Sequence, residues 1–125
     1  MLLTMIQIRY IRVLYQLQNT QTVKLAEVAN VLGVSKPSVH NMFRKLKRFG
    51  LIEQDEKGYS KLTEEGKEIA CKYEREFKIL FSFLTETLQI EKETAEENAI
   101  ALMGSERFGA EDLCRGIERF QRKTA

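Results

Sequence analysis

The sequence predicts a mainly α-helical protein in which one β-hairpin separates two groups of three helices. Apolar residues recur at helical spacing along most of the chain, while a short stretch near position 55 reads as strands joined by a glycine turn. A single proline among 125 residues leaves long segments free to form helices. We therefore expect a winged helix-turn-helix domain over residues 1–63 and a three-helix domain over residues 64–125.

The first three helices have clear sequence boundaries. Residues 3–18 carry apolar side chains at helical intervals until "NTQT" interrupts the pattern. A second helix is expected over about 23–32, because Gly33 suits the left-handed position that follows a helix. Ser35 is a favourable N-cap and a proline occupies the next turn, so the third helix should run over about 36–49.

The hairpin and the second group of helices follow. The stretch "LIEQDEKGYSKLT" contains two strand-like segments, 51–54 and 59–62, and the "DEKG" between them ends in a glycine that can adopt positive φ. A threonine and the acidic residues after it then favour a long helix over about 64–88. Two further helices are expected over about 92–103 and 110–123, separated by "GSERFG".

The stretch "LAEVANVLGVSKPSVHNMFRKL" has the residue spacing of a helix-turn-helix. Ala29 lets the two helices approach, and Gly33 allows the tight turn between them. Val39 and Met42 then pack the second helix of the motif on the first. This packing leaves the N-terminal face of the third helix free to enter the major groove of DNA. The alternative is a plain helical hairpin with a solvated basic face.

The exposed start of the third helix offers side chains that can contact base edges, since Asn pairs with adenine and Ser can contact either partner of a base pair. Basic side chains that follow, and those of the hairpin, suit phosphates or the adjoining minor groove. The predicted DNA-binding residues are Ser35, Lys36, Pro37, Ser38, His40, Asn41, Arg44, Lys45, Lys57, Tyr59 and Lys61.

Net charge divides unevenly along the chain. Residues 1–62 carry ten Lys and Arg against four acidic residues, a net charge of +6, and the remainder carries −4. This asymmetry indicates double-stranded DNA as a partner of the first half only. No apolar run approaches the roughly 20 residues of a membrane span, so no membrane association is expected. Two cysteines without CxxC spacing are typical of a cytoplasmic protein. With one histidine and no phosphate loop, we expect no enzyme.

Four stretches resemble the diphtheria-toxin-repressor and manganese-transport-regulator family of metal-dependent repressors. They are "YIRVLYQL", "LAEVANVLGVSKPSVHNMFRKLKRFGLI", "KLTEEGKEIA" and "FSFLTETLQIEKETAEENA", and a final helix follows them. The resemblance implies that the second half is a helical metal-binding and dimerisation domain. It also implies a homodimer, which should prefer an inverted-repeat DNA site because a two-fold protein presents two equivalent recognition helices.

The metal site of that family is missing from this sequence. Matching the positions places the family's acidic, sulfur and histidine ligands at Arg9, Arg12, Phe77, Ile100, Met103 and Gly104. None of these suits Mn²⁺ or Fe²⁺, which prefer carboxylate, imidazole and carbonyl ligands. Arginine cannot give up its proton, and methionine sulfur is too soft. We therefore expect no metal cofactor, and DNA binding without Mn²⁺ or Fe²⁺.

Two arginines at family ligand positions suggest a replacement for the cation. Arg9 and Arg12 are three residues apart and so share one helix face. One hypothesis is that they pair with carboxylates of the second half, such as those of Glu74, Glu76, Glu96 or Glu97, while apolar side chains fill the former metal site. The alternative is that both arginines are exposed and only add to the basic field.

Two rival functions remain open from the sequence. One is a regulator controlled by an unknown small ligand in the pocket that replaced the metal site, which would show as a cavity beside Phe77 and Met103. The other is a protein-interaction module that keeps the fold and binds DNA weakly. Weak binding that is insensitive to salt would favour the second rival.

Overall fold

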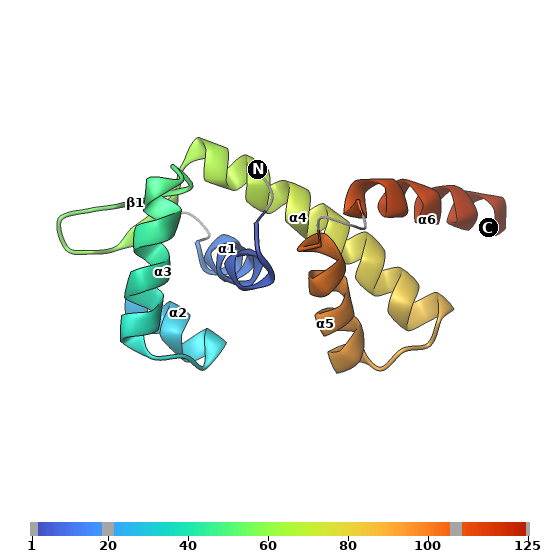
Figure 1. The fold of residues 1–125 in the computed structure, drawn as a ribbon, viewed down its shortest axis with the longest axis horizontal. Helices are drawn as coiled ribbons and strands as arrows, with labels where there is room; N and C mark the ends of the chain where they lie inside the picture. Colours follow the sequence, from blue (N-terminus) through green and yellow to red (C-terminus); the bar gives the residue numbers. More distant parts are fainter. Residues whose placement is uncertain (1–2, 19–21, 106–108, 125) are drawn as a thin grey trace. The chain divides into compact units, whose positions relative to one another are not determined.

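The computed structural model describes residues 3–18, 22–105 and 109–124. The described residues form helices and one small two-stranded sheet, as the sequence predicts (Figure 1). In chain order the elements are α1 (Met5–Leu17), α2 (Leu25–Leu32), α3 (Lys36–Arg48), β1 (Ile52–Gln54), β2 (Ser60–Leu62), α4 (Glu64–Ser82), η1 (Phe83–Thr87), α5 (Lys92–Met103) and α6 (Ala110–Thr124). The mainly α-helical winged-helix fold class is therefore confirmed.

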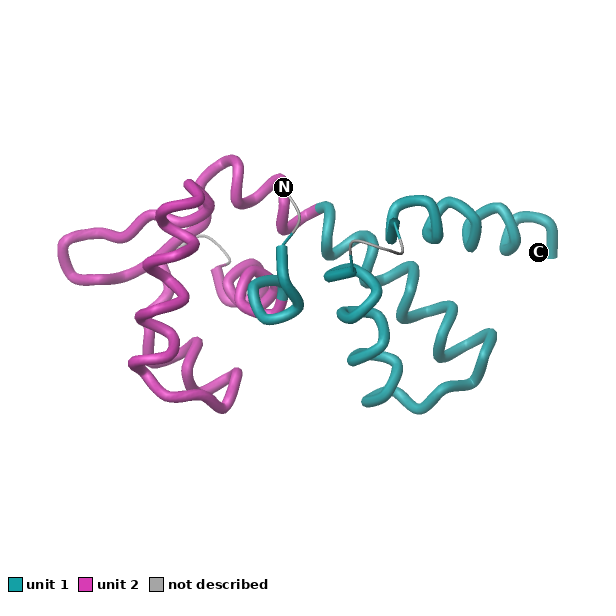
Figure 2. The backbone as a smooth tube through the Cα atoms, in the orientation of Figure 1, with its two compact units in different colours: residues 1–8, 72–125 teal, residues 9–71 magenta. Residues whose placement is uncertain are grey.

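The chain divides into two compact units, coloured separately in Figure 2. The N-terminal unit comprises residues 9–71, and the C-terminal unit comprises residues 1–8 together with 72–125. Helix α1 thus contributes its first residues to the C-terminal unit and the rest to the N-terminal unit.

The core of the N-terminal unit is built from α1, α2, α3 and the strands. Val28, Val39, Phe43 and Leu46 are fully buried, at the spacing expected for the inner faces of α2 and α3. The ring of Tyr10 in α1 meets Phe43 edge to face, with centroids 6.5 Å apart. Because these contacts bury one side of α3, the opposite side of the helix is exposed, and it forms the candidate site described below.

The hairpin pairs β1 with β2 in antiparallel register, with Glu53 opposite Lys61. Gly58 closes its turn at φ +83°, as the "DEKG" signal predicts. The sheet gains one further pair, because Val23 and Ser60 exchange backbone hydrogen bonds of 2.7 and 2.8 Å. The second helix consequently begins at Leu25 rather than at position 23, since the backbone of Val23 is committed to the sheet.

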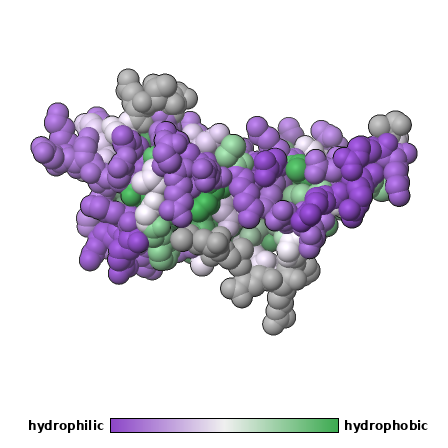
Figure 3. Space-filling model, turned by 90° about the horizontal axis from the view of Figure 1, so that it is seen from above, coloured by the Kyte–Doolittle hydropathy of each residue, from purple (hydrophilic) through white to green (hydrophobic). Residues whose placement is uncertain are grey.

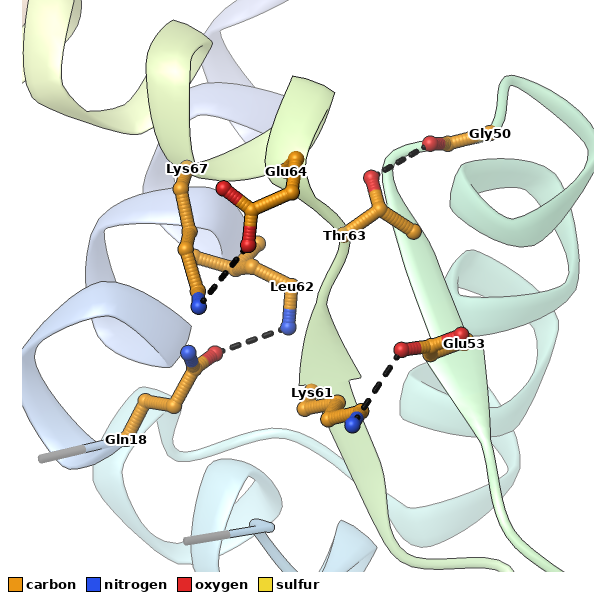
Figure 4. Close-up of polar contacts among 8 residues, drawn as sticks. All are labelled: Gln18, Gly50, Glu53, Lys61, Leu62, Thr63, Glu64 and Lys67. Carbon is orange, nitrogen blue, oxygen red and sulfur yellow. Dashed lines mark hydrogen bonds and ion pairs between the residues drawn. The ribbon is translucent and has the colours of Figure 1, made fainter. Parts of the chain in front are cut away.

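Thr63 joins the hairpin to α4 (Figure 4). Its hydroxyl donates to the Gly50 carbonyl at 2.6 Å and accepts from the Gly66 N–H at 3.0 Å, so the predicted helix start is confirmed. Nearby, the Leu62 N–H donates to the Gln18 side-chain oxygen at 2.7 Å. These bonds tie the end of the hairpin to the start of α4 and to the residues that follow α1 and α3.

The long helix ends differently from the sequence prediction. The α-helical part stops at Ser82, and η1 continues it as a π-helical turn rather than as an α-helix to position 88. The Leu88 N–H reaches the carbonyl of Phe83, five residues back, at 3.1 Å. The Thr85 hydroxyl donates to the Phe81 carbonyl at 2.8 Å, and Gln89 then adopts a φ of +56°. A side chain that bonds the preceding turn favours this widening.

The surface drawn in Figure 3 is mainly hydrophilic, with hydrophobic residues in small patches. Within the described residues, no helix is both long enough and apolar enough to cross a membrane.

Candidate nucleic-acid interface

Helix α3 starts at a serine cap. The Ser35 hydroxyl accepts from the Ser38 N–H at 3.2 Å, and the two serine hydroxyls lie 2.9 Å apart. The proline falls in the first turn, where a missing N–H costs no hydrogen bond. This cap orients the first turn of α3, and it places both predicted serines at its exposed start.

One side of α3 is exposed and polar, and the other is buried. Val39, Phe43 and Leu46 lie in the core with no exposed surface. All eight of the residues that the sequence predicts to contact DNA from this region are exposed: Ser35, Lys36, Pro37, Ser38, His40, Asn41, Arg44 and Lys45. The structure therefore brings them together along one exposed helix, with hydrogen-bonding side chains before the basic ones.

The turn before α3 has the expected geometry. Gly33 adopts φ +68°, and the adjoining Val34 N–H donates to the Ala29 carbonyl at 3.1 Å. Ala29 is buried between the helices, as its small size predicts. Val34, in contrast, is 39% exposed and contributes little to the core.

The predicted DNA-binding residues of the hairpin differ in their exposure and in their contacts. Lys57 is exposed near the tip, where the Asp55 carboxylate accepts the backbone N–H groups of Lys57 and Tyr59 at 2.9 Å. The Lys61 ammonium forms an ion pair with the Glu53 carboxylate (Figure 4), with the two atoms 3.3 Å apart. A phosphate contact by Lys61 would have to compete with this exposed ion pair, which is worth little by itself.

Sequence reasoning missed one basic residue at the hairpin. The Lys24 ammonium lies 5.6 Å from the centre of the Tyr59 ring, a cation–π contact between the N-cap of α2 and the residue before β2. This contact orients the half-buried tyrosine. No local pattern signals it, because the two residues are far apart in the sequence.

Six positions of this chain correspond to the metal ligands of the metal-dependent repressors that it resembles, and their side chains are unsuitable ligands for Mn²⁺ or Fe²⁺. In the C-terminal unit, Phe77, Ile100 and Met103 are buried. In the N-terminal unit, Arg9 and Arg12 are half-buried, so neither is simply a solvated surface residue. Across the described residues, no three His, Cys, Asp or Glu side chains approach closely enough to hold a metal ion. The residues present do not fit Mn²⁺ or Fe²⁺.

The last of these positions is closed by the side chain and backbone of Met5. A Cβ atom added at Gly104 would lie 2.8 Å from Cγ and 3.0 Å from the backbone nitrogen of Met5. Nearby in the chain, the Leu3 N–H donates to the buried Tyr73 hydroxyl at 3.2 Å. Leu3 and Met5 thus contact α4 and the end of α5, and Met5 leaves no room for a ligand side chain at Gly104.

Comparisons with known proteins identify relatives of this chain. Residues 1–60 match the family described as "Iron dependent repressor, N-terminal DNA binding domain". An uncharacterized HTH-type transcriptional regulator of Methanocaldococcus jannaschii is 34% identical over 85 residues, which are 68% of either chain.

Solved structures share the fold at low identity. The manganese regulator SloR superposes over 93% of this chain, with a TM-score of 0.76 and 23% sequence identity. IdeR of T. acidophilum superposes over 91% of this chain, with a TM-score of 0.68 and 23% sequence identity. This chain spans about half the length of both proteins, 53% in each case. A hypothetical protein of Sulfolobus solfataricus matches 97% of this chain and 91% of its own, with a TM-score of 0.69 and 16% identity.

Proposed function

The chain belongs to the family of iron-dependent repressors, and from this premise we propose that it binds an inverted-repeat DNA site as a homodimer that needs no metal cofactor. Membership of this family makes it a DNA-binding transcriptional regulator rather than an enzyme. We place its action in the cytoplasm, with residues 1–63 as the DNA-binding domain and residues 64–125 as the dimerisation domain.

The exposed face of α3 carries this proposal. An α-helix fits the major groove, and the residues near its N-terminus are those that reach base edges. Asn41 and His40 supply hydrogen-bonding groups there, and both are exposed. Arg44 and Lys45 lie next along the helix, where they suit phosphates on either side of the groove.

Chemistry and packing both support independence from metal. Six positions that would carry ligands hold two guanidinium groups, three apolar side chains and a glycine. At Gly104 the neighbouring Met5 occupies the space that a side chain would need. These positions offer a cation no suitable ligands, and at Gly104 the space is filled by Met5, so we infer that contact of the N-terminal segment with α4 and the end of α5 stands in for the metal.

Exposed apolar side chains in the C-terminal unit support a homodimer. Leu88, Leu113 and Phe120 are 52%, 37% and 48% exposed, respectively. Phe120 of α6 meets Phe83 of η1 edge to face at 6.1 Å, which leaves part of both rings available to a partner. Burying such surface contributes roughly 25 cal/mol per Å².

Fluorescence anisotropy over a salt series tests the proposal. The test DNA is the region upstream of the gene that encodes this protein. The logarithm of the association constant should fall linearly with the logarithm of the salt concentration, because binding releases cations from the phosphates. Only duplexes with both halves of an inverted repeat should bind tightly. Weak binding that salt does not change would contradict the proposal and favour a protein-interaction module.

A further inference from the structure

Lys24 lies where the helix-turn-helix meets the hairpin. It is the N-cap residue of α2, the first helix of the motif, and it is exposed. The preceding residue, Val23, exchanges backbone hydrogen bonds of 2.7 and 2.8 Å with Ser60 of β2. Val23 thus adds a further chain segment to the hairpin sheet, and this pairing holds the backbone of Lys24 beside the hairpin.

The Lys24 ammonium has an aromatic partner and no acidic one. It lies 5.6 Å from the centre of the Tyr59 ring. Among the described residues, no carboxylate comes within ion-pair distance of it, and the Glu27 carboxylate accepts the Lys24 backbone N–H at 3.1 Å instead. Lys61 of β2, in contrast, is paired with Glu53. The charge of Lys24 is therefore oriented but not neutralised.

The Tyr59 ring restrains the lysine side chain. Tyr59 is half-buried directly before β2, and an aromatic ring attracts a cation to its negative face. A lysine side chain has many rotamers, so fixing it when a partner binds costs entropy. Because the ring already limits these rotamers in the free protein, the cost of ordering Lys24 on binding is smaller.

The position and charge of Lys24 suit a phosphate group of DNA. The first helix of a helix-turn-helix crosses the DNA backbone, and Lys24 lies at the start of that helix. An ammonium binds phosphate as a point charge and fixes the protein on the duplex without reading a base. A contact here would lie outside α3, on the side of the motif where the hairpin begins.

We propose that Lys24 binds a phosphate of the DNA backbone, and that Tyr59 is a positioning residue whose ring holds the lysine side chain for that contact. The inference rests on the proposed DNA-binding function and adds a contact outside α3 to it. The sequence predicts a direct DNA contact for Tyr59, whereas here its ring acts through Lys24.

Fluorescence anisotropy with the upstream duplex, measured over a salt series, tests the lysine contact. We expect Lys24→Ala to reduce the slope of log K against log salt concentration by about 0.9, because one phosphate contact is lost. When salt rises about fourfold, the parent should therefore lose about 3.5-fold more affinity than the variant. Lys92→Ala, at an exposed lysine that begins α5, is the control and should keep the slope of the parent.

The outcomes separate this inference from the proposed function. An unchanged slope in Lys24→Ala overturns the inference alone. Equal reductions in Lys24→Ala and Lys92→Ala overturn it as well, because they would show only an effect of net charge. A parent that lacks salt-dependent binding overturns the proposed function together with the inference.

Variants of Tyr59 test the positioning role. Tyr59→Phe keeps the ring and should bind as the parent does. Tyr59→Leu removes the ring and should weaken binding by about two- to fivefold, the range that an exposed cation–π contact supplies. In the Lys24→Ala background, Tyr59→Leu should have no further effect.

Two results would overturn the positioning role. Weaker binding by Tyr59→Phe would indicate a contact through the hydroxyl group. An equal effect of Tyr59→Leu with and without the Lys24 side chain would show that the ring does not act through the lysine. Thermal melting followed by circular dichroism checks that each variant folds, and Tyr59→Met replaces Tyr59→Leu if the latter does not.

Discussion

Asn41 and Arg44 are both exposed on α3. We expect the Asn41 amide to contact a base and the Arg44 guanidinium to contact a phosphate, so substitutions at the two positions should have different effects on DNA binding. We expect Asn41→Ala to weaken specific binding by about 1–3 kcal/mol and to relax preference at one base pair, because a bidentate contact is lost. Binding measured against a panel of single-base operator variants checks this. Equal weakening on every variant would show that Asn41 does not read a base.

Arg44→Ala should have the opposite pattern. Loss of a phosphate contact weakens binding to all sequences and reduces the slope of the salt dependence by about 1. Lys123→Ala, the same change of charge at an exposed position of α6, is the control and should leave the slope unchanged. A slope that falls equally in both variants would indicate a general effect of net charge.

Glu76 makes stability depend on pH. Its pKa in the folded protein is raised above the ordinary 4.5, mainly by burial, so the folded state holds the proton more tightly than the unfolded chain does. Stability must then fall as pH rises from 4.5 through the folded pKa, and stay lower above it. We expect Glu76→Gln to be more stable than the parent at neutral pH and no more stable below pH 4.5. Urea unfolding at both pH values checks this, and a loss of stability at neutral pH would contradict it.

Sequence predicted which residues of α3 are exposed, since helical periodicity fixes the buried side. It could not predict the partners of the hairpin residues. Lys61 pairs with Glu53 across the strands, and Tyr59 meets Lys24 from the start of α2. Both contacts depend on register and packing, which no local pattern encodes.

At the scale of elements, the differences from prediction have tertiary causes. The second helix begins two residues later than expected because Val23 pairs with Ser60, more than 30 residues away along the chain. The long helix widens into η1 where Thr85 bonds the preceding turn. Caps and glycine turns, in contrast, are local, and those at Gly33, Ser35 and Thr63 were predicted correctly.

The packing of the N-terminal segment on α5 gives a direct test. We expect Gly104→Ala to destabilise the protein by about 1–3 kcal/mol, because the added methyl group overlaps Met5. Gly116→Ala is the matched control in α6: an added Cβ would meet only the Arg119 guanidinium, at an ordinary contact distance of 4.0 Å, so the same substitution should stabilise by up to about 1 kcal/mol. Urea unfolding measures both. Equal effects would show that Met5 yields without cost.

At the scale of the whole molecule, we predict a homodimer, and the molar mass in solution tests this prediction. The chain has a mass of 14.5 kDa, and light scattering should give twice that value. We expect Phe120→Glu to shift the protein toward the monomer, because a charge would enter the exposed apolar surface of α6. Phe49→Glu, at a phenylalanine of the N-terminal unit with similar exposure, should leave the mass unchanged. A monomeric parent would contradict the homodimer.

The family and the absence of its ligands could both be predicted from sequence, because ligand chemistry belongs to single positions. The contact of Met5 with Gly104 could not be predicted, since it joins segments about 100 residues apart. The pairing of Arg9 and Arg12 with carboxylates of the second half stays a prediction. If Arg12→Glu leaves DNA affinity unchanged, the arginines do not replace the metal.

We predict that DNA binding needs no metal, and fluorescence anisotropy with the upstream duplex measures this. The measurement compares EDTA with added Mn²⁺ or Fe²⁺ at constant ionic strength. We predict tight, salt-dependent binding in EDTA that neither metal strengthens. Binding that appears only with Mn²⁺ or Fe²⁺ would contradict the account, since it would require a cation site that the positions of Phe77, Ile100, Met103 and Gly104 do not provide.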